Sequence, residues 1–132
     1  MKTVFVNGCF DVLHRGHIEL FKFAKSHGDR LVVAIDSDNR VKNMKGDGRP
    51  FNNQVDREFV LRSICYIDDV VVFDSAEELE KLTLQFKPDT MIVGSDWQDK
   101  KVVGAQHAKE LKFFNRIGNY STTKILQHTS NR

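Results

Sequence analysis

Few residues in this sequence mark a secreted, membrane-bound or nucleic-acid-binding protein. Only two of its 132 residues are cysteines, Cys9 and Cys65, and neither belongs to a C-x-x-C pair. This usage is typical of a reduced cytoplasmic protein rather than a disulfide-stabilised secreted one. The apolar run near the start is far shorter than a signal peptide, and no stretch approaches the roughly 20 apolar residues of a membrane helix. We therefore expect a cytoplasmic protein with no membrane attachment.

The chain also has little net charge. The 20 basic and 18 acidic residues leave a formal net charge of +2, which is too small to indicate nucleic-acid binding. Apolar residues make up 40% and charged residues 29% of the chain, as in ordinary globular proteins. A chain of this length buries a sufficient core without disulfides or a structural metal, so we expect a single domain over residues 1–132.

Short β-rich runs alternate along the chain with longer segments of helical periodicity. The expected strands cover 3–7, 31–35, 70–73, 91–94 and 112–114. The expected helices cover 17–27, 53–64, 75–86, 104–111 and a segment from 121 onward. This alternation predicts an α/β fold, namely a Rossmann-like doubly wound parallel sheet in a three-layer α/β/α arrangement.

The unusual polar segments mostly follow the predicted strands. They cover residues 8–17, 37–50, 94–101 and 116–122. Ligands of such folds bind beyond the carboxyl ends of the strands, so these segments should converge on one site. The segment 37–50 is long for a structureless connection, and connections of this length are usually functional or disordered.

The first of these segments combines glycines with two histidines. Gly8 and Gly16 let the backbone approach a ligand closely. His14 and His17 are three residues apart, so both can lie on one face of a helical turn. A helix N-terminus offers N–H groups and a positive dipole end to a phosphate, and the imidazoles would stabilise charge on its oxygens. The segment therefore predicts a phosphate-transfer site.

Two other interpretations of the same residues are available. A histidine near a helix start is often structural, and two histidines at this spacing can bind metal, with Cys9 and Asp11 as further ligands. Because Cys9 and Asp11 lie on a turn without tetrahedral ligand spacing, we expect no metal site. The segment also lacks the Gly-Lys-Ser/Thr ending of a Walker A loop.

The run Gly-x-Phe-Asp-x-x-His-x-Gly-His over residues 8–17 resembles the signature of the cytidylyltransferase-like nucleotidylyltransferases. The resemblance implies that an acceptor phosphate attacks the α-phosphorus of a nucleotide and releases pyrophosphate, without a covalent enzyme intermediate. It implies catalytic roles for His14 and His17 and a substrate contact for Asp11. The nucleotide would be bound by three further residues of the run, Gly8, Cys9 and Phe10. Many members have threonine in place of Cys9, and a thiol is a weaker donor.

The segment 37–50 is rich in basic residues. It contains four basic residues and only two acidic ones. The basic residues are Arg40, Lys42, Lys45 and Arg49, and the acidic ones are Asp38 and Asp47. The segment can be a solvated loop, or a lid whose lysines clamp phosphates and neutralise developing charge. The run 45–50 is similar to that of bacterial heptose-1-phosphate adenylyltransferases. We assign Lys45 to the α-phosphate as a catalytic residue, Lys42 to the nucleotide, and Asp38 and Arg57 to the substrate.

Residues 116–123 combine an arginine, a glycine turn and a hydroxyl-rich helix start. Ser121 and Thr122 can cap the helix, present hydroxyls and amides to the β- and γ-phosphates, or do both. The Ser-Thr-Thr-Lys-Ile run is similar to the second signature of the family. Arg116 stands where glycerol-3-phosphate cytidylyltransferases carry an arginine. The resemblance thus adds Arg116, Ser121 and Thr122 to the nucleotide site.

Two subgroups of the family compete for the substrate assignment. The runs 45–50, 102–105 and 120–123 resemble the heptose-1-phosphate adenylyltransferases, whereas 94–97 and Arg116 resemble the glycerol-3-phosphate cytidylyltransferases. Asp96 can orient a hydroxyl or cap a turn, and Trp97 can stack on a substrate or simply pack. We assign both to the substrate site.

We predict transfer of a nucleotidyl group from ATP to a heptose-1-phosphate-type sugar. The alternatives are CTP with glycerol 3-phosphate, and a nucleotide-binding module that has lost catalysis. Mg²⁺ is expected to enter with the nucleotide. Homologues often form dimers, and the segment considered for a homodimer surface is 62–69.

Overall fold

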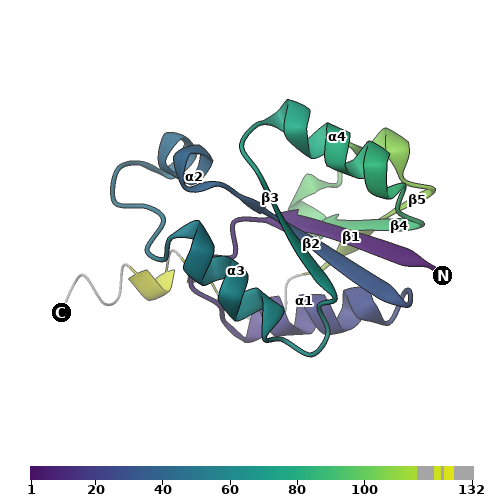
Figure 1. Ribbon diagram of the computed structural model, residues 1–132, viewed down its shortest axis with the longest axis horizontal. Coiled ribbons are helices and arrows are strands. Elements are labelled where there is room, and N and C mark those ends of the chain that lie inside the picture. The colour runs from purple at the N-terminus through teal and green to yellow at the C-terminus, as the bar shows by residue number, and fades with distance from the viewer. Residues whose placement is uncertain (116–120, 123, 127–132) are drawn as a thin grey trace.

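The computed structural model describes residues 1–115, 121–122 and 124–126. Within them, five parallel strands form one sheet in the order β3-β2-β1-β4-β5 (Figure 1). The strands are β1 (Thr3–Gly8), β2 (Arg30–Asp36), β3 (Asp69–Phe73), β4 (Thr90–Gly94) and β5 (Glu110–Phe114). The chain builds outward from β1 to β3 on one side and then returns to place β4 and β5 on the other. This reversal at β1 confirms the doubly wound prediction, and it opens a crevice at the carboxyl ends of β1 and β4.

Helices cover both faces of this sheet. They are α1 (Arg15–Lys25), α2 (Asp38–Lys45), α3 (Gln54–Arg62) and α4 (Ala76–Phe86). Figure 1 shows α1 and α3 along one face and α4 on the other, while α2 lies past the end of β2. The three-layer α/β/α arrangement is therefore confirmed. No helix of the described residues is both long and apolar enough to cross a bilayer.

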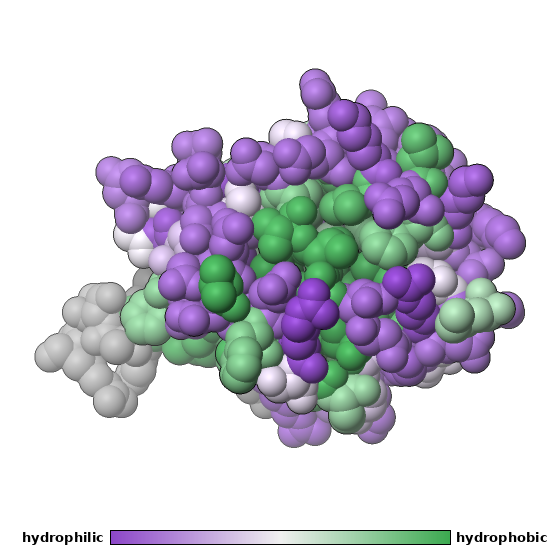
Figure 2. Space-filling view, in the orientation of Figure 1, coloured by the Kyte–Doolittle hydropathy of each residue, from purple (hydrophilic) through white to green (hydrophobic). Residues whose placement is uncertain are grey.

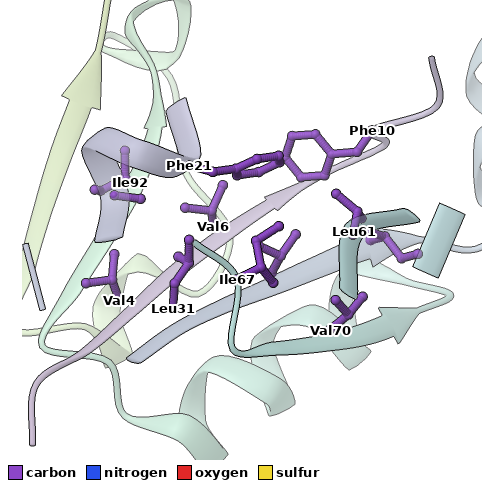
Figure 3. Packing of buried hydrophobic residues seen from close by; sticks show 12 residues of the cluster. Val4, Val6, Phe10, Phe21, Leu31, Leu61, Ile67, Val70 and Ile92 are labelled. Atoms are coloured by element: carbon purple, nitrogen blue, oxygen red, sulfur yellow. The ribbon is translucent and has the colours of Figure 1, made fainter. Parts of the chain in front are cut away.

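Each face of the sheet buries alternate residues of the strands. Val4 and Val6 of β1 pack with Phe21 of α1 and Leu61 of α3, as Figure 3 shows, whereas Phe5 packs on the α4 side. β2 alternates in the same way, with Leu31, Val33 and Ile35 on the first face and Val32 and Ala34 on the second. All of these side chains are buried, so the near-continuous apolar runs of β1 and β2 reflect burial on both faces.

The long polar segment after β2, which the sequence analysis treated as a solvated loop or a lid, is partly helical. It contains α2, whose first turn is capped by Ser37: the Oγ of Ser37 accepts from the N–H of Arg40 at 3.2 Å. Val41 is fully buried and anchors the helix, and Gly46 ends it at a φ of 100°, which suits glycine. The Ser37 cap and the burial of Val41 therefore stabilise a helix of two turns in a segment that is otherwise polar.

The predicted helix over 104–111 is wrong. The structure has only a short 3₁₀ turn, Ala105–His107, and β5 already begins at Glu110. Gly104 adopts a φ of 85°, and a Cβ there would lie 2.4 Å from the Oγ1 of Thr83 on α4. This close approach to α4 interrupts the helical path, and the apolar residues that suggested a helix pack on the α4 face from a turn instead.

Helix α3 reverses the usual inside–outside pattern. Its apolar residues Val55 and Phe59 are 71% and 73% exposed, whereas Arg57 is only 1% exposed. Among the apolar residues of α3, Leu61 alone is fully buried. The homodimer expected from the sequence stays a prediction. The buried arginine belongs to the site described next.

Candidate active site

Both histidines of the first loop take part in the start of α1. His14 is the N-cap residue, and its Nδ1 accepts a hydrogen bond from the N–H of Gly16 at 3.1 Å. The Nδ1 of His17 in turn accepts from the N–H of His14, also at 3.1 Å. The two imidazoles thus form a reciprocal capping box in which rings replace the more usual hydroxyl and carboxylate.

This cap fixes the tautomers of the two rings. Because each Nδ1 accepts a hydrogen bond, a neutral His14 or His17 carries its proton on Nε2. The ring centroids are 3.9 Å apart, so the two imidazoles lie side by side. The arrangement can donate two hydrogen bonds to neighbouring oxygens of one phosphate chain. The N–H of Gly16, which the sequence offered to a phosphate, is used by the cap instead.

Phe10 supports His17 from the core side of the loop. It adopts a φ of 49°, and its ring packs edge-on against His17, with centroids 5.5 Å apart, and against Phe21. The ring is buried (Figure 3), so the nucleotide can meet only the backbone of Phe10. A Cβ on Gly8 would lie 2.9 Å from this ring. Gly8 is therefore required for the packing of Phe10, and its close approach to a ligand stays a prediction.

Asp11 joins the first loop to the connection between α2 and α3. Its carboxylate accepts from the N–H groups of Phe51 at 2.6 Å and Asn52 at 2.7 Å, and Arg49 lies 3.5 Å away. The amide of Asn52 donates back to the carbonyl of Asp11 at 3.1 Å. Asp11 is buried and both its carboxylate oxygens are engaged, so in this structure it joins the two segments, and its contact with substrate stays a prediction.

Arg57 ties the same segments together from α3. Its guanidinium donates to the carbonyl oxygens of Cys9, Asp36 and Asn52 and to the Oδ1 of Asp38, at 2.8–3.0 Å. The side chain is completely buried, and its predicted contact with substrate stays a prediction. Asp38 retains 40% exposure of its side chain, and its role toward substrate stays a prediction.

Lys45, at the end of α2, lies near the first loop. Burial raises the pKa of the Cys9 thiol, while the positive charges of Lys45 and Arg57 act in the opposite direction. Such an effect requires the ammonium of Lys45 to lie within electrostatic reach of Cys9. Lys45 and Lys42, which lies one turn earlier on the same helix, are both exposed. The charge of Lys45 acts on Cys9 in the loop of the histidines, and the phosphate contacts of both lysines stay predictions.

The C-terminal signature also reaches the first loop. The hydroxyl of Thr122 donates to the carbonyl oxygen of Val12 at 2.6 Å, across 110 residues of sequence. Ser121 caps the turn that follows, since its Oγ accepts from the N–H of Lys124 at 3.3 Å. The hydroxyl of Thr122 therefore lies beside the segment that bears His14. Arg116 lies outside the described residues.

A second part of the site lies on the opposite face of the sheet. An open cleft of about 230 Å³ occupies the carboxyl ends of β1 to β4, on the side of α4. Its polar lining comes from Asn7, Asp36 and Arg40, and the Nε of Arg40 donates to Asp36 at 2.6 Å. Its apolar lining comes from Met44, Phe73, Leu79, Val93, Val102 and Val103. Figure 2 shows apolar surface in the middle of the view, where β3 lies between α3 and α4 in Figure 1.

The sequence analysis missed two of the polar cleft residues, Asn7 and Asp36, and did not give Arg40 a role of its own. A signal existed in the strand alternation. Asn7 and Asp36 each come two residues after a position buried on the α4 face, Phe5 and Ala34, so they continue an apolar stripe with a polar residue. A polar side chain at the carboxyl end of such a stripe indicates a ligand site.

The two substrate residues expected after β4 lie at the rim of the cleft. Trp97 lines it, and the ammonium of Lys100 lies 5.5 Å from the centre of its ring. Asp96 is exposed and folds back over Gly94, where a Cβ would lie 2.5 Å from its Oδ1. Their contacts with a substrate stay predictions. Among the described residues, no three histidine, cysteine or acidic side chains cluster as a metal site would require.

Comparison with known proteins identifies the family. Residues 5–128 match the family model described as cytidylyltransferase-like. The bifunctional protein HldE of Campylobacter fetus subsp. fetus (strain 82-40) is 46% identical over 123 residues, which cover 93% of this chain and 27% of that protein. The bifunctional protein HldE of Helicobacter pylori (strain J99) is 44% identical over 126 residues, which cover 96% and 27%. The chain thus spans about a quarter of the length of the curated relatives that it matches.

Solved structures share the fold. A lipopolysaccharide core biosynthesis protein from Thermoplasma volcanium superposes with a TM-score of 0.73 at 24% identity, over 89% of this chain and 99% of that one. Pantothenate synthetase from Thermus thermophilus superposes with a TM-score of 0.67 at 14% identity, over 95% of this chain and 61% of that one. With the family model matching nearly its whole length, this chain belongs to the cytidylyltransferase-like family.

Proposed function

We propose that this chain transfers the adenylyl group of ATP to a heptose-1-phosphate-type sugar and releases pyrophosphate. The observation that carries the proposal is the paired cap of α1, in which backbone hydrogen bonds to both Nδ1 atoms hold the rings of His14 and His17 3.9 Å apart. A phosphate oxygen of the sugar attacks the α-phosphorus, and the bond from that phosphorus to the pyrophosphate breaks in the same displacement. The products are a nucleotide-activated sugar and pyrophosphate.

The histidines act on the charge that moves during this displacement. As charge builds on the α-phosphate and the leaving pyrophosphate, donors already held in place stabilise it without reorganisation. The Nε2–H groups of His14 and His17 are such donors, because their backbone hydrogen bonds hold the rings. Lys45 adds a positive charge from α2 beside the same loop. Asp11 and Arg57 do not touch the phosphates in this account, and instead hold the loops that carry these groups.

The cleft on the α4 face is the place proposed for the sugar. It starts from the same ends of β1 and β4 as the histidine loop, so an acceptor there can direct a phosphate toward that loop. Its apolar walls suit the carbon faces of a sugar, while Asn7, Asp36 and Arg40 can meet hydroxyl groups. A cleft of about 230 Å³ is of the order that a monosaccharide occupies.

The choice of ATP rests on the resemblance of residues 45–50, 102–105 and 120–123 to heptose-1-phosphate adenylyltransferases. The two HldE proteins, at 44–46% identity, support the same subgroup. We further propose that Mg²⁺ enters with the nucleotide and neutralises part of its triphosphate charge. Activity in the cytoplasm follows from the substrates proposed, since ATP and sugar phosphates are cytoplasmic metabolites.

Pyrophosphate release tests the proposal. The chain is incubated with ATP or CTP against heptose 1-phosphate, hexose 1-phosphates and glycerol 3-phosphate, with and without EDTA. We expect turnover with ATP and heptose 1-phosphate, and its loss under EDTA. Turnover confined to CTP and glycerol 3-phosphate would replace the proposal with the cytidylyltransferase alternative. Tight nucleotide binding without turnover of any pair would favour the non-catalytic module.

A further inference from the structure

The floor of the cleft holds an amide that the fold itself does not use. The Oδ1 of Asn7 is buried, and no donor among the described residues bonds to it. A buried polar atom without a partner destabilises a protein, and native structures hold few of them. Such an atom in the lining of a ligand cleft indicates a group whose partner arrives with the ligand.

The register of the sheet explains why Asn7 points to the cleft. Phe5, two residues earlier on β1, is buried on the α4 face, so the side chain of Asn7 projects from that face too. Asn7 pairs in register with Ala34 on β2, which is also buried there. An apolar side chain at position 7 would extend the apolar core on the α4 face of the sheet. Asn7 is thus a polar residue at a position where its neighbours on that face, Phe5 and Ala34, are apolar.

The neighbouring polar residues of the cleft differ from Asn7 because they have partners. Asp36 accepts from the Nε of Arg40 at 2.6 Å, and the guanidinium of Arg40 also lies over the ring of Phe73, 5.4 Å from its centre. These residues balance each other's charge within the cleft. Asn7 is thus the neutral group left to recognise a neutral polar group, and a sugar hydroxyl can both donate to and accept from an amide.

We infer that Asn7 is a specificity-determining residue that hydrogen-bonds a hydroxyl group of the acceptor sugar. The inference rests on the proposed function, because it takes the acceptor of that reaction as the occupant of the cleft. A site built to bond a substrate hydroxyl rejects analogues that lack it, because its buried polar group is then left unpaired. Asn7 therefore selects a hydroxylated acceptor at the expense of stability of the unliganded protein.

The variant Asn7→Leu tests this inference, because leucine has a similar size but no hydrogen-bonding group. Acceptors are heptose 1-phosphate and a set of its monodeoxy analogues, with ATP as the nucleotide. We expect kcat/KM for heptose 1-phosphate to fall about 10- to 100-fold, while the Kd for ATP stays within about twofold. Wild type should discriminate against one deoxy analogue by a similar factor, and Asn7→Leu should lose that discrimination. Its Tm should equal or exceed that of wild type.

A matched control is Asn39→Ala on α2, where the asparagine is exposed and outside the cleft, and we expect wild-type kinetics. Asn7→Ala serves in place of Asn7→Leu should the larger side chain prevent folding. A lower Tm with unchanged selectivity would overturn the inference and make Asn7 structural. Weaker ATP binding would overturn it in favour of a nucleotide contact. If wild type turned over with heptose 1-phosphate in either case, the proposed function would stand, whereas no such turnover by wild type would overturn both.

Discussion

The guanidinium of Arg57 donates to the carbonyl oxygen of Cys9 across 2.9 Å, from a helix that begins more than forty residues later in the sequence. The same nitrogen, Nη1, also donates to the carbonyl of Asp36 at the end of β2. One buried cation thus fixes the loop after β1, the end of β2 and the start of α3 relative to one another. The positions of the histidines and of α2 depend on this contact.

Replacing Arg57 with alanine should destabilise the protein by about 2–4 kcal/mol, because it leaves three carbonyl oxygens without their donor. Urea unfolding followed by circular dichroism measures this change. The control is Arg15→Ala, whose exposed ion pair with Glu19 should contribute less than about 1 kcal/mol. If Arg57→Ala kept the stability of wild type but had a raised KM, the direct substrate contact predicted from the sequence would be supported.

Replacing His17 with asparagine should separate its structural role from its catalytic one. The Oδ1 of asparagine can still accept the N–H of His14, so α1 should form, but no Nε2–H remains to meet a phosphate. We expect turnover to fall at least about 100-fold with little change in Tm. Pyrophosphate release and thermal unfolding measure the two effects. Wild-type turnover in a folded Asn variant would remove His17 from the chemistry.

The thiols should report the position of Lys45. Burial raises the pKa of Cys9, so iodoacetamide should modify the exposed Cys65 first. The charge of Lys45 favours the Cys9 thiolate, and Lys45→Gln should therefore raise that pKa further and slow the modification of Cys9. Mass spectrometry over a time course at about pH 8, near the ordinary thiol pKa, gives both rates.

The matched control for Lys45→Gln is Lys42→Gln, which removes the same charge one turn earlier on α2. We expect a smaller change in the rate at Cys9, because the positive charges that act most strongly on this thiol are those of Lys45 and Arg57. Equal slowing by both substitutions would show that the net charge of α2, rather than the placement of Lys45, controls the thiol.

Stability should fall in acid partly through Asp89. The N–H of Thr3, at 2.8 Å, and the ammonium of Lys109 hold the pKa of Asp89 below its usual value. As the pH falls, the unfolded chain protonates Asp89 before the folded protein does. The contribution of this carboxylate to the free energy of unfolding is therefore full above the ordinary carboxyl pKa of about 3.9. It is lost as the pH falls through the lower pKa of Asp89 in the folded protein. Asp89→Asn should therefore be less stable than wild type at neutral pH.

The stability difference between wild type and Asp89→Asn should narrow as the pH falls below about 5. Urea unfolding at a series of pH values measures it. Asp47→Asn, on the exposed loop after α2, is the control and should cost less than about 0.5 kcal/mol. A difference that widens in acid would show that the carboxylate of Asp89 does not act through these two partners.

Patterns with a strict physical period determined much of this protein from sequence. Alternation of strand and helix gave the doubly wound sheet, and the asparagine at 53 gave the start of α3, where its Oδ1 accepts from the N–H of Asp56. The spacing of His14 and His17 placed both rings on the first turn of α1. These are local properties, so the residues that produce them are close together in the chain.

Tertiary contacts decided the roles of the remaining site residues. Asp11 and Arg57 are charged residues that the sequence analysis assigned to the substrate, and in the structure they bind backbone groups 21 to 48 residues away. Local sequence cannot reveal this, because a charge gives no sign of which distant backbone group it will meet on folding. For Asn7, strand alternation indicates which face of the sheet bears the side chain. Only the pairing of β1 with β2 and β4 shows that its amide lies in a cleft without a partner among the residues that the structure describes.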